Sequence, residues 1–276
     1  MKVAIQGIRG AFHEVAAKKH FDNDISIVEC LTFKSLCDAL KDGKVDHAVM
    51  AIENTIAGSI LGNYSLIRDY RFHVIGEVYL NIKMNLLTLP GVALKNIKTV
   101  ESHPIALQQC KEFLYEQLSH AVLRESNDTA ESARDLGISG DTTKAVIAAD
   151  RCARLYGLEI KRAGIETNKQ NFTRFLALSR VPVKDNSNNK ASISLQLGHE
   201  PGTLADILTI FKANGANLTK IQSVPVIGKP YEYHFHIDFE WEDYSRYEKT
   251  MEEVEDKALS LHLLGEYKKA FFGLNE

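Results

Sequence analysis

The sequence has only four cysteines, and no two of them form a CxxC pair. Disulfide frameworks and structural zinc sites depend on closely spaced cysteines, so reduced thiols in the core of a cytoplasmic protein are the simplest interpretation. The chain also lacks an apolar run near the roughly 20 residues of a membrane-spanning helix. Arg9 interrupts the apolar start of the chain before a signal peptide could form. We therefore expect a cytoplasmic protein that does not cross a membrane and binds no metal ion through its cysteines. The cysteines are Cys30, Cys37, Cys110 and Cys152.

An excess of positive charge is also missing, since the formal net charge is −3 at pH 7. Nucleic-acid-binding proteins usually carry a basic face or tail, and the sequence shows neither. We therefore expect no nucleic-acid partner. An anionic ligand must be held by local donors, because the field of the whole protein does not attract it.

Common motifs of nucleophilic, metal-dependent and nucleotide-dependent catalysis are absent as well. The sequence contains no GxSxG, no HExxH and no Cys–His signature. Residues 7–10 read Gly-Ile-Arg-Gly, which matches neither nucleotide fingerprint and favours a plain turn over a phosphate loop. His234 and His236 fall on one face of a predicted strand, where ordinary strand residues are a simpler interpretation than a two-histidine metal site. We expect neither a cofactor nor a metal.

Length and composition predict two domains. A chain of 276 residues is long enough for about two separate cores. Residues 181–191 are polar, rich in Asn and Ser, and without hydrophobic periodicity, which is typical of a linker. We place one domain at residues 1–180 and a second at 192–276.

The first domain alternates short apolar runs with helical patterns, which predicts parallel sheets covered by helices. Residues 72–80 and 81–89 are consecutive strands without an intervening helix, so we expect two α/β lobes around a cleft. The other predicted strands are 2–6, 26–30, 45–52, 97–102, 121–126 and 144–149. The predicted helices are 12–21, 32–40, 105–118, 129–137 and 150–157.

The second domain has a different pattern. Its predicted order is strand, helix, two strands, helix and strand, which is the ferredoxin-like βαββαβ arrangement. The strands fall at 191–199, 217–228, 230–241 and 261–270, and the helices at 201–215 and 245–259.

Small polar residues follow several strands of the first domain, where ligands bind in open α/β sheets. Glu53, Asn54 and Thr55 follow one strand, and Ser102 begins a helix after another. Residues 127–129 follow a third strand and begin the next helix, and helix N-termini favour anions. The alternatives stay open: Ser102 and Asn127 or Asp128 could be helix caps, and Glu53 with Asn54 could be a solvated loop pair.

Thr173 and Arg174 stand side by side in an apolar strand pattern at residues 171–178. Burying an arginine without an anionic partner costs several kcal/mol. Arg174 must therefore reach solvent or meet an acid, and a substrate carboxylate is one candidate.

Five motifs follow one another along the first domain: a glycine motif, a Glu-Asn segment, a Ser-His-Pro helix start, an Asp-Thr-Ala helix and a Thr-Arg-Phe signature. They are 7–13 (GIRGAFH), 51–60 (AIENTIAGSI), 102–110 (SHPIALQQC), 127–133 (NDTAESA) and 171–175 (NFTRF). In this order they resemble the motifs of a bacterial prephenate dehydratase. After the linker, 201–204 (PGTL), 217–223 (NLTKIQS) and 231–240 (YEYHFHIDFE) are similar to parts of an ACT domain, which binds an amino acid between paired copies.

The resemblance implies a two-lobed, periplasmic-binding-protein-like catalytic domain followed by a ferredoxin-like ACT regulatory domain. The implied reaction converts prephenate to phenylpyruvate, CO₂ and water, with feedback by L-phenylalanine and a homodimer or homotetramer formed through ACT domains. The implied catalytic residues are Thr173, Arg174, Asn54, Ser102 and Gln109. The implied substrate-binding residues are Glu53, Thr55, His103, Thr129 and Phe175. The implied effector-binding residues are Gly202, Thr203, Leu204, Asn217, Leu218 and Gln222.

Departures from the family pattern bear on the site and on the effector motif. Thr55 stands where serine is usual and keeps a hydroxyl, whereas Gln222 and Val224 replace a glutamate and an arginine of the effector motif, which leaves the details of effector binding open. The sequence does not decide between prephenate and its aminated relative arogenate. A solute sensor that binds without reacting is the remaining alternative, because two lobes around a cleft suit both functions.

Overall fold

The computed structural model describes residues 1–271, and the chain divides into two compact units. Of the described residues, one unit contains Met1–Ser59 and Val78–Phe175, and the other contains Ile60–Glu77 and residues 176–271. Strands β5 (His73–Asn81) and β11 (Phe172–Ser179) contribute residues to both units.

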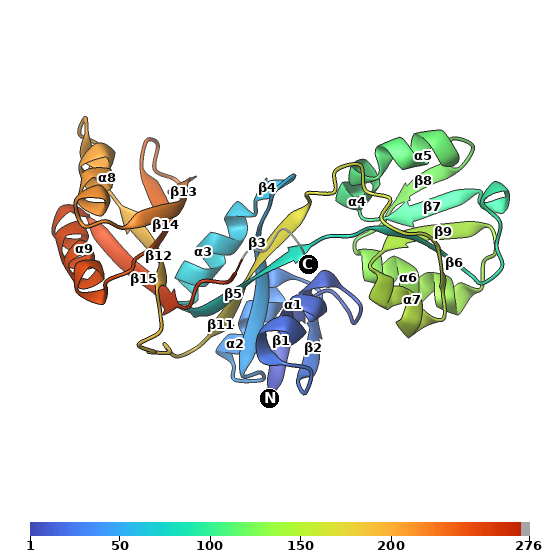
Figure 1. The fold of residues 1–276 in the computed structure, drawn as a ribbon, viewed down its shortest axis with the longest axis horizontal. Coiled ribbons are helices and arrows are strands. Elements are labelled where there is room, and N and C mark those ends of the chain that lie inside the picture. The colour runs from blue at the N-terminus through green and yellow to red at the C-terminus, as the bar shows by residue number, and fades with distance from the viewer. Residues whose placement is uncertain (272–276) are drawn as a thin grey trace. The chain divides into compact units, whose positions relative to one another are not determined.

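The first sheet contains the predicted N-terminal strands. Its other elements are β1 (Lys2–Gln6), α1 (Phe12–Phe21), β2 (Ser26–Cys30), α2 (Phe33–Lys41), β3 (His47–Asn54) and β4 (Gly58–Ser59). The strand order is β2-β1-β3-β11-β5, with β4 paired to β3 (Figure 1). Strand β1 pairs in parallel with β2 and β3. Val3, Ala4 and Ile5 are fully buried, because α1 and α2 pack against these central strands. The predicted parallel pairing is confirmed for β1, β2 and β3, whereas β4 is antiparallel to β3.

The second sheet is mixed. Its elements are β6 (Asn85–Thr88), β7 (Thr99–Ser102), α4 (Pro104–Gln109), α5 (Lys111–Gln117), β8 (Val122–Glu125), α6 (Thr129–Ser139), β9 (Lys144–Ala148), α7 (Asp150–Tyr156) and β10 (Glu159–Arg162). The order is β10-β6-β9-β7-β8. Strand β7 pairs in parallel with β8 and β9, whereas β6 is antiparallel to β9 and β10. Helices α4 and α5 cover one face and α6 and α7 the other (Figure 1).

The chain passes from the first sheet to the second between β5 and β6, and it returns between β10 and β11. The prediction of consecutive strands in this region is therefore confirmed. The predicted single helix over 105–118 is wrong, because it breaks at Cys110 between α4 and α5. The Cys110 N–H donates to the carbonyls of Ala106 and Leu107, and its backbone leaves the helical region at φ −104° and ψ 11°.

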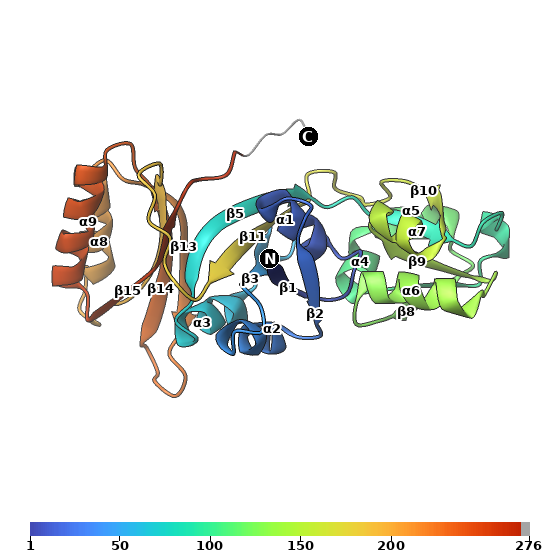
Figure 2. The ribbon, with the colours of Figure 1, turned by 90° about the horizontal axis from the view of Figure 1, so that it is seen from below.

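The C-terminal part has the predicted βαββαβ order. Its elements are β12 (Lys190–Gln196), α8 (Thr203–Ala213), β13 (Asn217–Pro225), β14 (Tyr233–Glu240), α9 (Tyr244–Lys257) and β15 (Ser260–Tyr267). They form a four-stranded sheet in the order β13-β14-β12-β15, antiparallel at each pairing, with both helices on one face (Figure 2). Ile193, Ile237 and Phe239 are fully buried beneath the helices. Strand β12 begins at Lys190, inside the segment that we assigned to the linker.

Helix α3 (Leu61–Asp69) was not predicted. Gly62, Asn63 and Ser65 are poor helix formers and obscure its apolar periodicity. Tyr64 and Ile67 are buried, so packing stabilises this helix in spite of its composition. Within residues 1–271, no helix has both the length and the apolar character that a bilayer crossing requires.

Candidate functional site

Asn54, at the end of β3, is the centre of a directed hydrogen-bond network. Its side-chain oxygen accepts from the backbone N–H groups of Ile56 (2.9 Å) and Ala57 (2.8 Å). Those two bonds fix the orientation of the amide, since only the oxygen can accept. The Asn54 Nδ2 atom then donates to Thr173 Oγ at 2.9 Å and to Asn171 Oδ1 at 2.7 Å.

The network continues from the first sheet to the second. Asn171 is fully buried, and its Nδ2 donates to Gln109 Oε1 at 2.9 Å. Gln109 ends α4, so a chain of side-chain amides connects β3 to a helix of the other sheet. Three of the five predicted catalytic residues are thus brought together: Asn54, Thr173 and Gln109.

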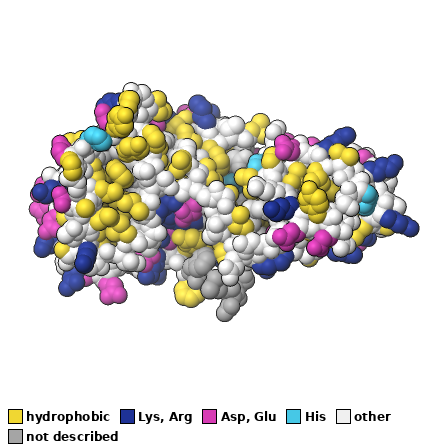
Figure 3. Space-filling model, turned by 90° about the horizontal axis from the view of Figure 1, so that it is seen from above, with side chains coloured by type: hydrophobic (Ala, Val, Ile, Leu, Met, Phe, Trp, Pro, Cys, Tyr) yellow, Lys and Arg dark blue, Asp and Glu magenta, His cyan; other side chains and the backbone are white. Residues whose placement is uncertain are grey.

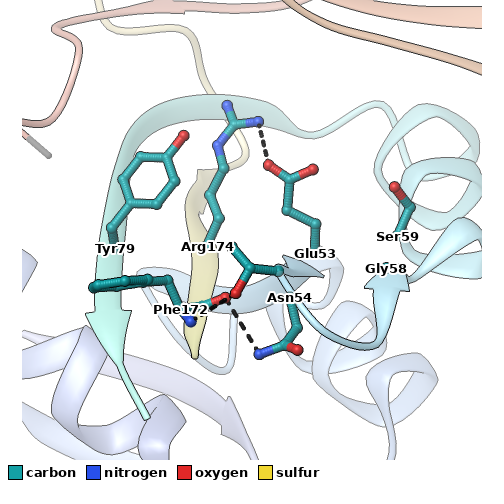
Figure 4. Close-up of a pocket in the computed structure, with 8 residues that line it drawn as sticks. Glu53, Asn54, Gly58, Ser59, Tyr79, Phe172 and Arg174 are labelled. Atoms are coloured by element: carbon teal, nitrogen blue, oxygen red, sulfur yellow. Dashed lines mark hydrogen bonds and ion pairs between the residues drawn. The ribbon is translucent and has the colours of Figure 1, made fainter. Parts of the chain in front are cut away.

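Arg174 lines a separate cavity of about 280 Å³ (Figure 4). The arginine is only 2% exposed, and its Nη1 lies 3.6 Å from Oε1 of Glu53, whose side chain is 29% exposed. The Arg174 guanidinium carbon lies 5.9 Å from the centre of the Tyr79 ring. An acid of the protein therefore approaches Arg174, a partner that the sequence had left undecided. The cavity is lined by Glu53, Asn54, Thr55, Gly58, Ser59, Tyr79, Phe172 and Arg174.

Thr173 and Arg174 lie on opposite faces of β11, because successive side chains of a strand alternate. Phe172 and Arg174 line the cavity of Figure 4, where the Asn54 side chain points away from Glu53. A small substrate that contacts both Thr173 and Arg174 must therefore lie across the end of β11 and not over one face.

A second cavity, of about 260 Å³, lies beside Gln109. It is bordered by Ile56 and Ala57, from the loop that orients Asn54, and by the segment that returns from β10 to β11. Both cavities therefore share the loop after β3. The second cavity is lined by Ile56, Ala57, Ile105, Gln108, Gln109, Lys111, Thr167 and Asn168.

Two predicted substrate-binding residues make contacts within the protein. The Thr55 hydroxyl donates to the Gln170 carbonyl (3.0 Å) and accepts from the Phe172 N–H (2.9 Å), which ties its loop to β11. Phe175 is buried and packs edge-on against His13, with ring centres 5.0 Å apart. Burial lowers the pKa of His13 to about 4, so this imidazole is neutral at pH 7.

Ser102 neither caps α4 nor lines either cavity. It is fully buried, and its hydroxyl donates to the Ile147 carbonyl at 2.7 Å. His103 is the cap of α4, and its Nδ1 accepts from the Ile105 N–H at 3.3 Å. A catalytic Ser102 would have to break its hydrogen bond to the Ile147 carbonyl and donate to substrate.

Asp128 is the cap of α6, where it accepts from the N–H groups of Ala130 (2.8 Å) and Glu131 (2.9 Å). Burial raises the pKa of this carboxyl, and the two N–H groups offset part of that effect. The capping alternative is therefore confirmed for Asp128. Thr129, the predicted substrate-binding residue, is the half-buried first residue of the helix.

The N-terminal glycine loop is a turn with its donors occupied. The N–H groups of Gly7, Arg9 and Gly10 donate to the Cys30 carbonyl (2.8 Å), Glu29 (2.8 Å) and Glu14 (2.7 Å). Gly10 has φ +95°, and a Cβ there would lie 2.8 Å from Cys152 Sγ. The turn therefore needs glycine for its conformation and for close packing, and phosphate would find these N–H groups already bonded.

The two strand histidines are not gathered into a metal site. His236 is buried, and neither ring nitrogen has a hydrogen-bond partner. In the part of the chain that the structure describes, no three His, Cys, Asp or Glu side chains are placed to hold a metal ion. The four cysteines are buried free thiols.

The predicted effector-binding residues divide between the two ends of α8. Gly202 is the N-cap of α8, and the Thr203 hydroxyl donates to the Gly198 carbonyl at 3.0 Å, next to Leu204. Asn217 and Leu218 begin β13, after the C-terminal end of α8, whereas Gln222 lies further along this strand, level with Ser194 near the end of β12 that leads into α8. An 11-residue helix is about 16 Å long, so one small ligand cannot reach both Gly202 and Asn217 in a single chain.

Sequence reasoning missed Asn171 and Tyr79. Both lie within predicted strands, where a polar or aromatic residue is unremarkable. A signal was available for Asn171, because it stands two residues before Thr173 and hence on the same side of the chain. Tyr79 gave none, since only the fold brings it near Arg174.

Fold and site together are those of an α/β protein in which a network of neutral side-chain amides and one buried arginine lie beside two small cavities. A family model described as prephenate dehydratase matches residues 3–183, and the chain belongs to the prephenate dehydratase family. The predicted enzyme class is therefore confirmed.

Three relatives show how far the similarity extends. The chain is 35% identical over 280 residues to the chloroplastic arogenate dehydratase/prephenate dehydratase 2 of Arabidopsis thaliana, covering 97% of this chain and 72% of that one. It is 27% identical to the prephenate dehydratase of Arthrobacter aurescens solved in complex with L-Phe, with a TM-score of 0.87 over 97% of this chain and 90% of that chain. It is 25% identical to GqqA, described as a novel type of quorum quenching acylase, with a TM-score of 0.88 over 98% of each chain.

Proposed function

We propose that this protein converts prephenate to phenylpyruvate, CO₂ and water at the network of Asn54, Thr173 and Gln109. The direction of one hydrogen bond carries the proposal. Asn54 Nδ2 donates to Thr173 Oγ, so the threonine oxygen is an acceptor there and its own hydrogen can point at another oxygen. The departing hydroxyl of the substrate is that oxygen.

The hydrogen bond matters because hydroxide is the difficult leaving group. Loss of CO₂ and hydroxide makes the ring aromatic, so the reaction is strongly downhill once hydroxide can depart. A positioned proton donor contributes about 10²- to 10⁴-fold, or about 3 to 5 kcal/mol. A threonine hydroxyl is a very weak acid, so we propose that Thr173 relays a proton from water as the C–O bond breaks.

The two carboxylates of prephenate are then bound by different side chains. Arg174 offers a planar fork that matches one carboxylate bidentately. The Gln109 oxygen accepts a hydrogen bond from Asn171, so the Gln109 Nε2 is the group that can donate to substrate. A neutral donor suits the carboxylate that leaves as CO₂, because strong charge pairing would stabilise the ground state.

Phenylpyruvate formation by the purified protein tests the proposal directly. We expect turnover of prephenate without added metal or cofactor. Hydrolysis of an N-acyl amine is the comparison reaction, since one structural relative is described as an acylase. An inert protein with prephenate and arogenate, or one that only hydrolyses the acyl amine, would contradict the proposal.

Arogenate is the second candidate substrate, and Glu53 is the observation that favours it. Its carboxylate stands 3.6 Å from the Arg174 guanidinium in the same cavity. A cation beside an anion suits the carboxylate and ammonium of an α-amino acid, and arogenate carries the amine that prephenate lacks. Parallel kcat/KM measurements on both substrates decide which one this pocket prefers.

We also propose that the C-terminal part is an ACT domain that binds L-phenylalanine between two subunits. Gly202 and Asn217, at opposite ends of α8, support a shared site, since the N-cap of one copy can meet the start of β13 in another. Strand β13 is an edge of its sheet, and an unpaired edge favours pairing. Hydrophobic side chains also gather on this part of the chain, at the left of Figure 3. Large hydrophobic residues that are exposed in the C-terminal part include Leu208, Ile221, Ile227 and Tyr231.

Two measurements test this regulation. Light scattering with and without L-phenylalanine should give a dimer or tetramer, and phenylalanine should lower the turnover of prephenate. Trp241, the single tryptophan, stacks on Tyr247 with ring centres 4.0 Å apart in the core beneath α9. Its fluorescence should therefore change when phenylalanine binds. A monomer whose turnover and fluorescence ignore phenylalanine would refute the assignment.

A cytoplasmic location completes the proposal. Four buried thiols without a disulfide suit a reducing compartment. Fractionation of cells that express the protein from its own promoter would test this location.

A further inference from the structure

Asn171 is fully buried between two side chains to which the proposed function gives roles. Its Oδ1 accepts from Asn54 at 2.7 Å, and its Nδ2 donates to Gln109 at 2.9 Å. It therefore uses one acceptor and one donor of its amide, each on a different partner. No substrate contact is needed to explain its burial, so it is a candidate for acting through its neighbours.

The direction of both bonds has consequences for the reacting groups. Because Asn171 accepts one N–H of Asn54 at 2.7 Å, the other N–H is left for Thr173 Oγ at 2.9 Å and, at the longer distance of 3.2 Å, the Phe172 carbonyl. The threonine oxygen that accepts it must donate its own hydrogen elsewhere. Because Asn171 donates to the Gln109 oxygen, the Gln109 nitrogen turns away from it. A side chain that only accepted, or only donated, would reverse one of these two directions.

We propose that Asn171 is a positioning residue that sets the donor direction of Thr173 and Gln109. This inference rests on the proposed function of those two residues. Asn171 joins them across the two sheets, so one amide coordinates the group at the leaving hydroxyl with the group at the carboxylate. A buried asparagine of merely structural importance would stabilise the fold without setting these directions.

Asn171→Asp provides a test that a structural role does not predict. When the introduced carboxyl is ionised it can only accept, so Gln109 must turn its nitrogen toward it and withdraw it from substrate. When the carboxyl is protonated, its O–H donates to Gln109 and its other oxygen accepts from Asn54, as the native amide does. Burial raises the pKa of a carboxyl, so this change falls within a range accessible to assay.

The measured quantity is kcat/KM of the variant divided by that of the wild type. We expect a loss of at least roughly 10-fold at pH 8, which shrinks toward the wild-type value as the pH falls to about 5. The control is Asn85→Asp. Asn85 is also a buried asparagine, but its side chain bonds only main-chain groups, at Ala148 (3.3 Å) and Gly164 (3.2 Å). The kcat/KM of Asn85→Asp relative to the wild type should not rise as the pH falls.

Asn171→Leu removes both hydrogen bonds at similar volume, and we expect it to lose kcat at every pH. A ratio for Asn171→Asp that does not change with pH, or Asn171→Leu within twofold of wild type, would overturn the proposal. If Asn171→Leu does not fold, the pH dependence of Asn171→Asp decides alone.

The proposed function can fail separately. If the wild type turns over neither prephenate nor arogenate, the proposed function is wrong. The positioning role is then tested by the chemical shifts of the side-chain amide NMR signals. Asn171→Asp should then shift the Asn54 and Gln109 signals with pH, whereas Asn85→Asp should not. Signals that stay fixed in Asn171→Asp would overturn the positioning role as well.

Discussion

The side-chain nitrogen of Asn54 lies 2.9 Å from the hydroxyl oxygen of Thr173, although 119 residues separate the two in sequence. The bond joins the end of β3 to the start of β11. It orients the threonine, because an oxygen that accepts from Asn54 has its own hydrogen available for a second partner. The position of Thr173 and the direction of this hydrogen bond together leave its hydroxyl hydrogen available to a ligand where β3 ends and β11 begins.

Replacement of Thr173 by valine should lower kcat by roughly 10²- to 10⁴-fold with a small change in KM. Valine keeps the shape of the side chain and removes only the hydroxyl, so the loss falls on an interaction made in the transition state. Thr173→Ser is the matched control and should keep most of the turnover. Steady-state kinetics on prephenate decides, and equal kcat values for the valine and serine variants would contradict the role.

Arg174→Lys should act mainly on substrate binding. Lysine keeps the charge but loses the fork that pairs bidentately with a carboxylate, and a charge-assisted hydrogen bond contributes about 1.5 to 3 kcal/mol. We expect KM to rise roughly 10- to 100-fold with kcat less affected. An unchanged KM together with a lower free energy of unfolding would mean that Arg174 only supports the fold with Glu53.

Glu53→Gln should separate the two candidate substrates. The carboxylate lies beside Arg174, where it repels an incoming dianion and attracts an ammonium group. Its neutralisation should therefore raise KM for arogenate and lower KM for prephenate. Competition between the two substrates in one reaction measures the change in preference, and an equal effect on both would show that Glu53 does not discriminate.

Most of the fold could be predicted because its elements have clear periodicity. The apolar run at Lys2–Gln6 and the strict alternation at the start of the C-terminal part both appear as strands. Helix α3 escaped prediction because its stability comes from tertiary contacts, such as the stacking of Tyr64 on His236, at 4.9 Å between ring centres. The break at Cys110 escaped for a similar reason, since no proline or glycine marks it.

The candidate site was less predictable than the fold. Motifs identified Asn54, Gln109 and Thr173, which the structure brings into one network. They could not show that Ser102 gives its hydroxyl to a backbone carbonyl, or that Arg174 faces the other side of β11. The direction of each hydrogen bond depends on neighbours distant in sequence. Asn171 acts only through two such neighbours, Asn54 and Gln109.

Lys190 and Glu77 form a buried ion pair, with Nζ and Oε1 3.0 Å apart and side chains 3% and 1% exposed. Lys190→Met removes the cation beside this buried carboxylate, which keeps the Ala270 N–H as a donor at 3.1 Å, and should cost about 3 to 5 kcal/mol of unfolding free energy. Lys190→Met combined with Glu77→Leu should cost less than the single change, because the buried carboxylate is removed as well. Glu240, the other acid near Lys190 at 3.7 Å, is 21% exposed and still pairs with Lys269.

Urea unfolding measures these costs, and an exposed pair supplies the control. Lys34 and Asp38 are 2.8 Å apart but 73% and 43% exposed, so Lys34→Met should change the unfolding free energy by only about 0.5 kcal/mol. A Lys190→Met variant as stable as this control would show that water reaches the buried pair.

The stability of the fold should fall in mild acid, because burial lowers the pKa of His236 to about 4. The nearby cations Arg68 and Lys220 and the neighbouring His234 lower this pKa further, while Asp238 opposes them. In the unfolded chain a histidine has a pKa of about 6.5. The unfolded state therefore binds more protons between these two values, and the free energy of unfolding falls as the pH drops from about 6.5 to 4.

The loss attributable to His236 should approach roughly 3 kcal/mol at the acid end, from a difference of about 2.5 pKa values. His236→Phe keeps an aromatic ring for Tyr64 to stack on and removes both buried nitrogens, so its unfolding midpoint in urea should depend less on pH across this range. Ser194→Ala is the matched control, since Ser194 is a buried neighbour of His236 in the sheet register and does not titrate. The control should lose stability with acid as the wild type does. If His236→Phe does so too, another group causes the acid sensitivity, because a phenylalanine cannot take up the proton that unfolding gives to this histidine.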